Sequence, residues 1–232
     1  CIAARLLENG KTVGVGTGAP CAAAMLAQKT GSPDIYIVFE AGGEAPILSK
    51  MPISVGDSRT FHQALVASSM GRLFESCQRG LIDYAFLGGA QIDQYGNLNS
   101  TVIGDFYKPK VRFPGSGGAN DFASFCWKTI VMTKHNSKRF VEKLDFLTTP
   151  GYLSGPEDRE KAGLPEGTGP YKIITDLAVM GFDHQTKRMK VESLHSGVTF
   201  KQVEENTGFE LLKDNNINVT PPPTEEDLKI LR

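Results

Sequence analysis

Two apolar segments near the start of the chain constrain its fold more than any other feature. Residues 12–16 (TVGVG) and 35–39 (IYIVF) have the length of strands, and residues 20–27 between them are expected to form a helix that begins at Pro20. Proline is favourable at the first position of a helix. A continuous apolar run such as 35–39 is typical of a strand covered on both faces, as parallel strands usually are. The order strand, helix, strand predicts an α/β fold with a mainly parallel open sheet flanked by helices.

The rest of the sequence predicts a similar alternation. Apolar residues recur with helical spacing between Phe61 and Arg79, which predicts one amphipathic helix. Asp227 stands three residues after Thr224, and this capping pattern indicates a helix near the end of the chain. An antiparallel addition to the sheet is expected where two later apolar segments pair. The further elements expected are strands at 83–87, 129–133, 144–148, 171–182 and 188–194, and short helices at 122–127 and 199–206.

Two segments lack this alternation. Residues 91–110 (QIDQYGNLNSTVIGDFYKPK) are polar, and Tyr95-Gly96-Asn97 has the composition of a tight turn. Long loops in compact domains usually carry function. Residues 151–170 are rich in proline and glycine and are interpreted as an insertion, so we expect residues 1–232 to form a single domain.

Composition and charge narrow the classes of partner. Hydrophobic residues make up 40% of the chain and charged residues 22%, as in ordinary globular proteins. The formal net charge is -1, and the basic residues are scattered. A field this weak argues against nucleic acid and against an anionic membrane surface as partners. We therefore expect a metabolic substrate.

The cysteines and histidines form no recognisable site. Four cysteines lie far apart without a CxxC pair, which indicates reduced thiols and a cytoplasmic protein. The four histidines have no metal-ligand spacing, so we expect no metal and mostly surface or packing roles for them. No membrane helix is expected, because no stretch approaches the ~20 uninterrupted apolar residues that such a helix needs. No secretory signal is expected either, because residues 1–11 resemble a short amphipathic helix. Missing ends are consistent with a first residue that is Cys1 rather than Met.

The first candidate for a binding motif is the turn after the first strand. Residues 14–19 (GVGTGA) satisfy a GxGxx(G/A) pattern between a strand and a helix, and Asp34 follows twenty residues after Gly14. Such a turn can hold the pyrophosphate of a dinucleotide on helix-terminal amides. Glycine is also common there only for tight packing, and this second interpretation is favoured.

The second candidate is Glu40, which follows the buried run 35–39 and precedes Gly42 and Gly43. Ligands of open α/β sheets bind at the carboxyl ends of the strands. Glycines beside the carboxylate would let a substrate approach closely. A solvated loop glutamate is the alternative interpretation, and position alone does not decide between the two. Glu44 is a further carboxylate nearby, for which a solvated loop position is expected.

A glycine cluster supplies the complementary chemistry. Residues 115–121 (GSGGAND) precede a short expected helix, and consecutive amides in such a turn can form an anion-binding nest. A flexible hinge is the alternative. Together with a carboxylate elsewhere in the chain, the cluster is typical of a nucleophile that faces an oxyanion hole.

Blocks of sequence with specific order and spacing support this chemistry. Residues 86–120 (FLGGAQIDQYGNLNSTVIGDFYKPKVRFPGSGGAN) resemble the family I CoA-transferases, in particular β subunits of the glutaconate type. The resemblance extends over nearly the whole chain. Its other parts are VGVGTGAP, IVFEAG, SVGDSR, TTPGYLSGPEDREKAGLP and VEENTGFEL.

The resemblance implies a role for each matching residue. Glu40 matches the glutamate that becomes acylated, while Ala41 replaces the serine or asparagine that follows it in the family, so a hydrogen bond from that side chain is absent. The oxyanion-hole amides fall on Gly117, Gly118 and Ala119. The residues expected to border the CoA and acyl site are Gln91, Asn97, Asn99 and Ser100.

The implied activity is the transfer of CoA between an acyl-CoA and a carboxylic acid (glutaconate or similar) through a glutamyl-CoA thioester on Glu40. CoA is then a substrate, and no permanently bound cofactor is expected. The resemblance further implies a homologous α subunit as partner, in a heterodimer or a larger hetero-oligomer. Two alternatives stay open: a lyase or hydrolase of CoA esters on the same fold, and a non-catalytic binding subunit. Retention of Glu40 favours transfer.

Overall fold

The computed structural model describes residues 1–232, which divide into two compact units. The first unit contains residues 1–86, 125–128 and 222–232, and the second contains 87–124 and 129–221. Each unit is described separately below. The single domain expected from the sequence stays a prediction.

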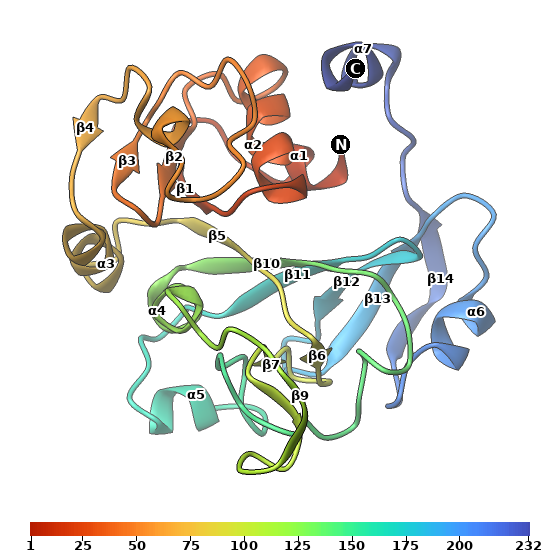
Figure 1. Ribbon diagram of the computed structural model, residues 1–232. Coiled ribbons are helices and arrows are strands. Elements are labelled where there is room, and N and C mark those ends of the chain that lie inside the picture. The colour runs from red at the N-terminus through yellow and green to blue at the C-terminus, as the bar shows by residue number, and fades with distance from the viewer. The chain divides into compact units, whose positions relative to one another are not determined.

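The first unit is built on the predicted strand, helix, strand segment. β1 (Thr12–Val15) pairs in parallel with β2 (Tyr36–Phe39) and with β5 (Tyr84–Leu87). The connecting helix α2 (Ala19–Lys29) begins with Gly18 as N-cap and Pro20 in its first turn, and it packs beside α1 (Ile2–Arg5) (Figure 1). This arrangement buries most side chains of the two apolar runs, as expected for parallel strands that are covered on both faces.

The last helix of the chain packs against the rest of the first unit. α7 (Glu225–Leu231) contacts α2, and Asp227 forms an ion pair with Arg5 at 2.7 Å. The predicted cap is confirmed, since the Thr224 hydroxyl accepts a hydrogen bond from the Asp227 amide and the Asp227 carboxylate accepts one from the Thr224 amide.

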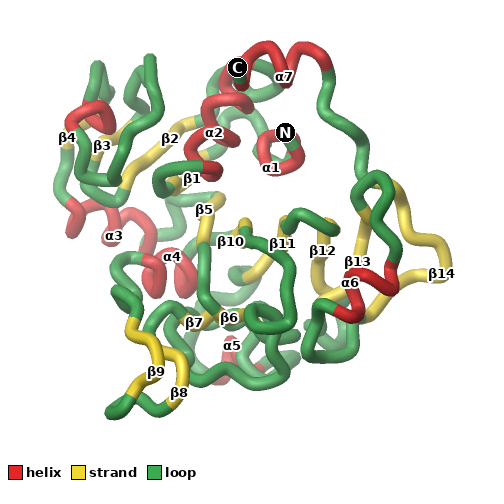
Figure 2. Tube along the Cα trace, turned by 45° about the vertical axis from the view of Figure 1, so that its right-hand side comes forward, coloured by secondary structure: helices red, strands yellow, loops and turns green.

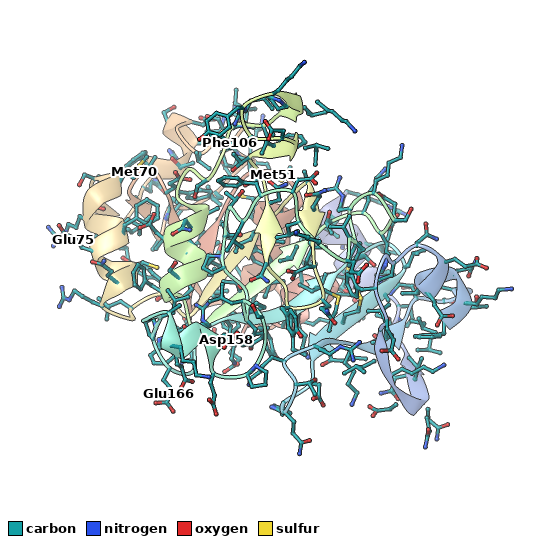
Figure 3. The ribbon with its side chains drawn as sticks, turned by 90° about the horizontal axis from the view of Figure 1, so that it is seen from below. Met51, Met70, Glu75, Phe106, Asp158 and Glu166 are labelled. Atoms are coloured by element: carbon teal, nitrogen blue, oxygen red, sulfur yellow. The ribbon has the colours of Figure 1, made fainter.

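The helix predicted at 61–79 is wrong in its first half. A 3-10 helix at Ser58–Phe61 is followed by the short strand β4 (Val66–Ala67), and helix α3 covers only Met70–Gln78. β4 pairs with β3 (Gly43–Glu44), which in turn pairs with β2, so sheet hydrogen bonds compete with a longer helix. The apolar residues that suggested a helical face include Leu65 and Met70, and both are exposed (Figure 3 labels Met70 on α3).

The second unit contains a run of strands in the order β14-β13-β12-β11-β10. The outer pairs β10–β11 and β13–β14 are parallel, and the pairs between them are antiparallel. The segment 171–182, predicted as one strand, is two strands, because Thr175 accepts hydrogen bonds from the amides of Leu177 and Ala178 and turns the chain. The strands are β10 (Lys128–Met132), β11 (Pro170–Ile174), β12 (Ala178–Phe182), β13 (Met189–Leu194) and β14 (Leu212–Val219).

The polar segment 91–110, expected as a long loop, instead forms two small hairpins. One pairs β6 (Gln91–Ile92) with β7 (Leu98–Asn99), and the predicted turn at Tyr95-Gly96-Asn97 joins them. The other pairs β8 (Val102–Gly104) with β9 (Pro109–Arg112) and extends outward as the β8–β9 hairpin (Figure 2).

A strand predicted at 144–148 is wrong, since these residues contain no strand and only Thr149 forms an isolated bridge, to Leu98. The remaining helices of the second unit are α4 (Ala119–Phe125), α5 (Asp158–Lys161) and α6 (Phe200–Glu205). The predicted α/β fold, with parallel strands, flanking helices and antiparallel additions, is confirmed.

Candidate active site

Glu40 lies in the first unit at the carboxyl end of β2. The preceding residue Phe39 is completely buried, and Glu40 itself is half-buried. A tight turn follows, in which the Gly42 amide donates to the Phe39 carbonyl at 2.8 Å. We call residues 39–43 the Glu40 turn. The carboxyl end of a parallel strand is where open α/β sheets place ligands, so the position suits a reacting carboxylate.

The two glycines of the Glu40 turn are in contact with the protein itself. A Cβ atom at Gly42 would collide with the carbonyl oxygen of Ser68, and one at Gly43 would collide with that of Thr60. These glycines are therefore required for packing of the turn against β4 and the 3-10 helix. These contacts explain why glycine occurs at both positions, and no space for a substrate has to be assumed.

Glu44 is not a solvated loop residue. It belongs to β3, and its carboxylate accepts a hydrogen bond from the Ser68 hydroxyl at 2.9 Å and one from the Tyr36 hydroxyl at 3.3 Å. Burial, together with the nearby negative charge of Glu44, raises the pKa of Tyr36. The three side chains fix the hairpin that follows Glu40.

The predicted oxyanion residues lie in the second unit, where residues 115–118 form what we call the glycine turn. Gly115 has a φ of 94° and Gly117 a φ of 51°, which favour glycine. Ser100 anchors the start of the turn, because its carbonyl accepts from the Gly115 amide and its hydroxyl donates to the Gly115 carbonyl.

The glycine turn continues into α4. Ser116 caps the helix: its carbonyl accepts from the Ala119 amide and its hydroxyl accepts from the Asn120 amide, both at 3.0 Å. The Ala119 amide is thus used within the turn. Of the three predicted donors, Gly117 is exposed, Gly118 is buried and Ala119 is half-buried.

Buried Arg159 holds the other end of α4. Its guanidinium donates to the carbonyls of Ala123 and Ser124 in the last turn of the helix, at 2.6 and 2.9 Å. It also donates to the carbonyls of Pro150 and Gly151 and to the Thr168 hydroxyl. Burial lowers the pKa of Arg159 to about 10, so the group stays charged at neutral pH. A cation at this end of a helix is favourable.

Three of the four residues predicted to border the CoA site hold the hairpins together. Asn99 donates from its amide to Gln91 at 2.7 Å, and Gln91 in turn donates to Asp145. Asn97 accepts from the Gly151 amide and donates to Asp93 and to the Leu153 carbonyl. Gln91, Asn97 and Asn99 are almost fully buried. Their contact with CoA stays a prediction.

An open pocket of about 690 Å³ lies beside these residues in the second unit. Gln91 and Ser100, both predicted from the sequence, line it together with Gly88 and Gly89 after β5. Lys138 and Arg139 also line it. No motif in the sequence singled out these two cations, because their neighbours in the pocket are distant in the chain.

The turn at residues 14–19 does not have the features of a dinucleotide site. Asp34 lies before β2, at its amino end, whereas a carboxylate that binds a ribose is expected at the carboxyl edge of the sheet. Asp34 also exchanges two hydrogen bonds with Asn9. Gly18, with a φ of 76°, acts as N-cap of α2, so the glycines of this turn are explained by its backbone conformation.

The structure contains no cluster of three or more His, Cys, Asp or Glu side chains that could hold a metal ion. No helix combines the length and the apolar character needed to cross a membrane. His135 is buried between the hydroxyls of Thr175 and Thr207, and this burial lowers its pKa to about 4. Its role is therefore packing.

The chain is similar to known CoA-transferase subunits. It is 42% identical to the B-type subunit of 3-oxoadipate CoA-transferase from Pseudomonas knackmussii, over 99% of this chain and 88% of the relative. It is 39% identical to the corresponding subunit of glutaconate CoA-transferase from Acidaminococcus fermentans, over 94% and 84%. The crystal structure of the latter organism's glutaconate coenzyme A-transferase matches with a TM-score of 0.94 and 38% identity, over 100% of this chain and 90% of that chain. The family model described as coenzyme A transferase matches residues 2–206, and the chain belongs to this family.

Proposed function

We propose that this chain is part of a CoA-transferase that moves CoA between an acyl-CoA and a carboxylic acid, with Glu40 as nucleophile. The observation that carries the proposal is the position of Glu40, half-buried at the carboxyl end of β2 on a turn that packing holds rigidly. The relatives named for 3-oxoadipate and glutaconate support transfer to or from such acids.

The proposed reaction has two halves. The ionised carboxylate of Glu40 attacks the thioester carbonyl, which gives a mixed anhydride and CoA thiolate. The thiolate attacks the glutamyl carbonyl of the anhydride, the first carboxylate leaves, and a glutamyl-CoA thioester remains on the enzyme. An incoming carboxylate reverses these steps and departs as the new acyl-CoA. The kinetics are then ping-pong.

Each step passes through a tetrahedral oxyanion, and we propose the amides of Gly117 and Gly118 as its hydrogen-bond donors. The glycine turn supports this assignment by its conformation and by its anchors, Ser100 at one end and Arg159 through α4 at the other. The Ala119 amide is a weaker candidate because it donates to Ser116. Loss of one such donor typically costs about 3 kcal/mol of transition-state stabilisation.

The proposal includes a partner. Both relatives carry the name of one subunit of an enzyme, and we infer that this chain assembles with a homologous α subunit in a heterodimer or a larger hetero-oligomer. CoA enters as substrate, with no permanently bound cofactor. None of the four cysteines forms a disulfide bond, which supports a location in the reducing cytoplasm.

Product analysis separates this function from its alternative, a lyase or hydrolase of CoA esters. The enzyme, assembled with its co-expressed partner, is incubated with an acyl-CoA and a second carboxylic acid. A transferase converts the acid into its CoA ester, mole for mole, and releases no free CoA thiol. Accumulation of free thiol without a new CoA ester, or loss of carbon dioxide, would establish the alternative.

A further inference from the structure

The pocket beside Gln91 and Ser100 combines apolar walls with two positive charges. Ile103, Phe113 and Pro114 supply apolar surface, and the backbone of Gly88 and Gly89 supplies a wall without side chains. Most of the exposed lining is apolar. Pockets of this volume and lining suit small organic ligands whose few polar groups meet a charged residue.

Arg139 is held in the pocket wall by the backbone on both sides. Its Nη1 donates to the Gly89 carbonyl at 2.5 Å, and its own carbonyl accepts from the Ile92 amide at 2.7 Å. Its Nε is buried and has no hydrogen-bond partner. A ligand in the pocket does not reach an atom this buried, so its contact with Arg139 would be made at Nη2, which forms no hydrogen bond within the protein.

The charge of this wall is not neutralised within the protein. Neither Lys138 nor Arg139 forms an ion pair, and Lys138 is exposed. The neighbouring carboxylate of Asp145 accepts instead from the Gln91 side chain and from the Gly104 amide. The pocket therefore has a positive end and an apolar interior.

We propose that this pocket recognises the distal carboxylate of a dicarboxylic acyl group, with Arg139 as the main contact and Lys138 as a weaker one. The inference rests on the proposed CoA-transferase function and names its substrate class. A guanidinium whose Nη2 is not used by the protein can donate to a carboxylate, and the apolar walls fit a short aliphatic chain. A phosphate of CoA is the other anion that such a site could take, and the experiments below distinguish the two.

Acceptor preference is the first test. With one acyl-CoA donor, kcat/KM is measured for glutarate and for pentanoate, which have the same number of carbons and differ by one carboxylate. In Arg139→Gln the ratio of the two values should fall about 100-fold, in Arg139→Lys about 10-fold, and in Lys138→Gln about 3-fold. Lys134→Gln, exposed in the same segment but outside the pocket, should leave the ratio unchanged. An unchanged ratio in Arg139→Gln overturns the proposal.

Direct binding is the second test, and it does not depend on the chemistry at Glu40. Glutarate is titrated calorimetrically into the assembled Glu40→Ala enzyme, with and without Arg139→Gln. Loss of glutarate binding only in the second protein supports the subsite even if the glutamyl mechanism fails. Equal glutarate affinity in both proteins overturns the subsite. A third measurement compares acetyl-CoA with its analogue that lacks the 3′-phosphate. If Arg139→Gln abolishes the preference of the enzyme for acetyl-CoA, the pocket binds a phosphate of CoA, and this result also overturns the proposal.

Discussion

In the Glu40 turn glycine is required by contact, whereas in the glycine turn it is required by conformation. Gly43 lies against the backbone of Thr60, which leaves no room for a side chain. Gly115 has nothing within 4 Å of the place that a Cβ atom would take, but its φ is 94°. The first turn is therefore packed against neighbouring backbone, whereas the second has open space at Gly115 and is exposed at Gly117.

This difference matches the needs of the two groups that the proposed reaction uses. A carboxylate is a weak nucleophile toward a thioester, so its catalytic value depends on a fixed position. Oxyanion donors must be positioned and must also be reachable by the substrate. Rigidity comes from packing in the Glu40 turn and from anchors at both ends in the glycine turn.

The largest expected effect of a single substitution is that of Gly43→Ala. The added methyl group collides with backbone, which cannot move as a side chain can, and we expect a loss of about 3 kcal/mol or more of unfolding free energy. Chemical denaturation measures it. Gly31→Ala is the matched control, because nothing lies within 4 Å of its Cβ position. Equal stability of the two variants would show that the Glu40 turn is not tightly packed.

Arg159→Met tests the anchor of the glycine turn. The variant keeps volume but leaves the carbonyls of Ala123 and Ser124 without their donor, and we expect a loss of about 3 kcal/mol. Lys161→Met, on the same short helix and largely exposed, should change stability by less than about 0.5 kcal/mol. A similar small change in Arg159→Met would mean that α4 is held by other contacts.

Acid should weaken the second unit through His135. Its pKa is lowered in the folded protein to about 4 and returns to its ordinary value near 6.5 on unfolding. Between these values the unfolded chain binds the extra proton, so stability rises with pH across this window and is lost as pH falls from 6.5 to 4. The contribution is at most about 3 kcal/mol. His135→Gln should reduce the slope of unfolding free energy against pH. An unaltered slope would mean that other titratable groups cause the pH dependence of stability.

Gly115→Ala should have the smallest effect. Its surroundings are open, so the cost is that of a positive φ, about 1 kcal/mol. Gly88→Ala is the control, because Gly88 has equally open surroundings but no positive φ. Its melting temperature should be closer to that of the parent protein. If the two variants have the same melting temperature, the conformation of the glycine turn is not strained by a side chain.

The sequence predicted those parts of the fold that neighbouring residues determine. The strand before Glu40 was predictable because four or five consecutive apolar residues leave no face for water. The helix that begins after Thr224 was predictable because its cap lies within three residues. Likewise, Thr199 and Gln202 form a capping box at the start of α6.

The errors occur where distant residues decide. Leu65 and Met70 suggested a helical face, but pairing of β4 with β3 determines the structure there. The β6–β7 hairpin was missed because its strands are two residues long and are held by Asp145, which accepts from Gln91 across 54 positions. No local pattern records such a contact.

The candidate site shows the same division. Glu40 and the glycine turn could be found because each is a local motif with an evident chemical use. Arg139 could not, because its significance comes from a guanidinium without an ion-pair partner and from pocket walls contributed by segments remote in sequence. Ala41, in place of the family's polar residue, has no explanation in the contacts of the turn.

If Glu40 carries the CoA group during turnover, mass spectrometry of the enzyme detects it there. The assembled enzyme is incubated with an acyl-CoA in the absence of an acceptor acid, and the peptide that contains Glu40 is examined. We predict one CoA per active site, bound as a thioester to Glu40, removed by added carboxylic acid and absent from Glu40→Ala. An unmodified Glu40 peptide in an enzyme that still transfers CoA would contradict the account.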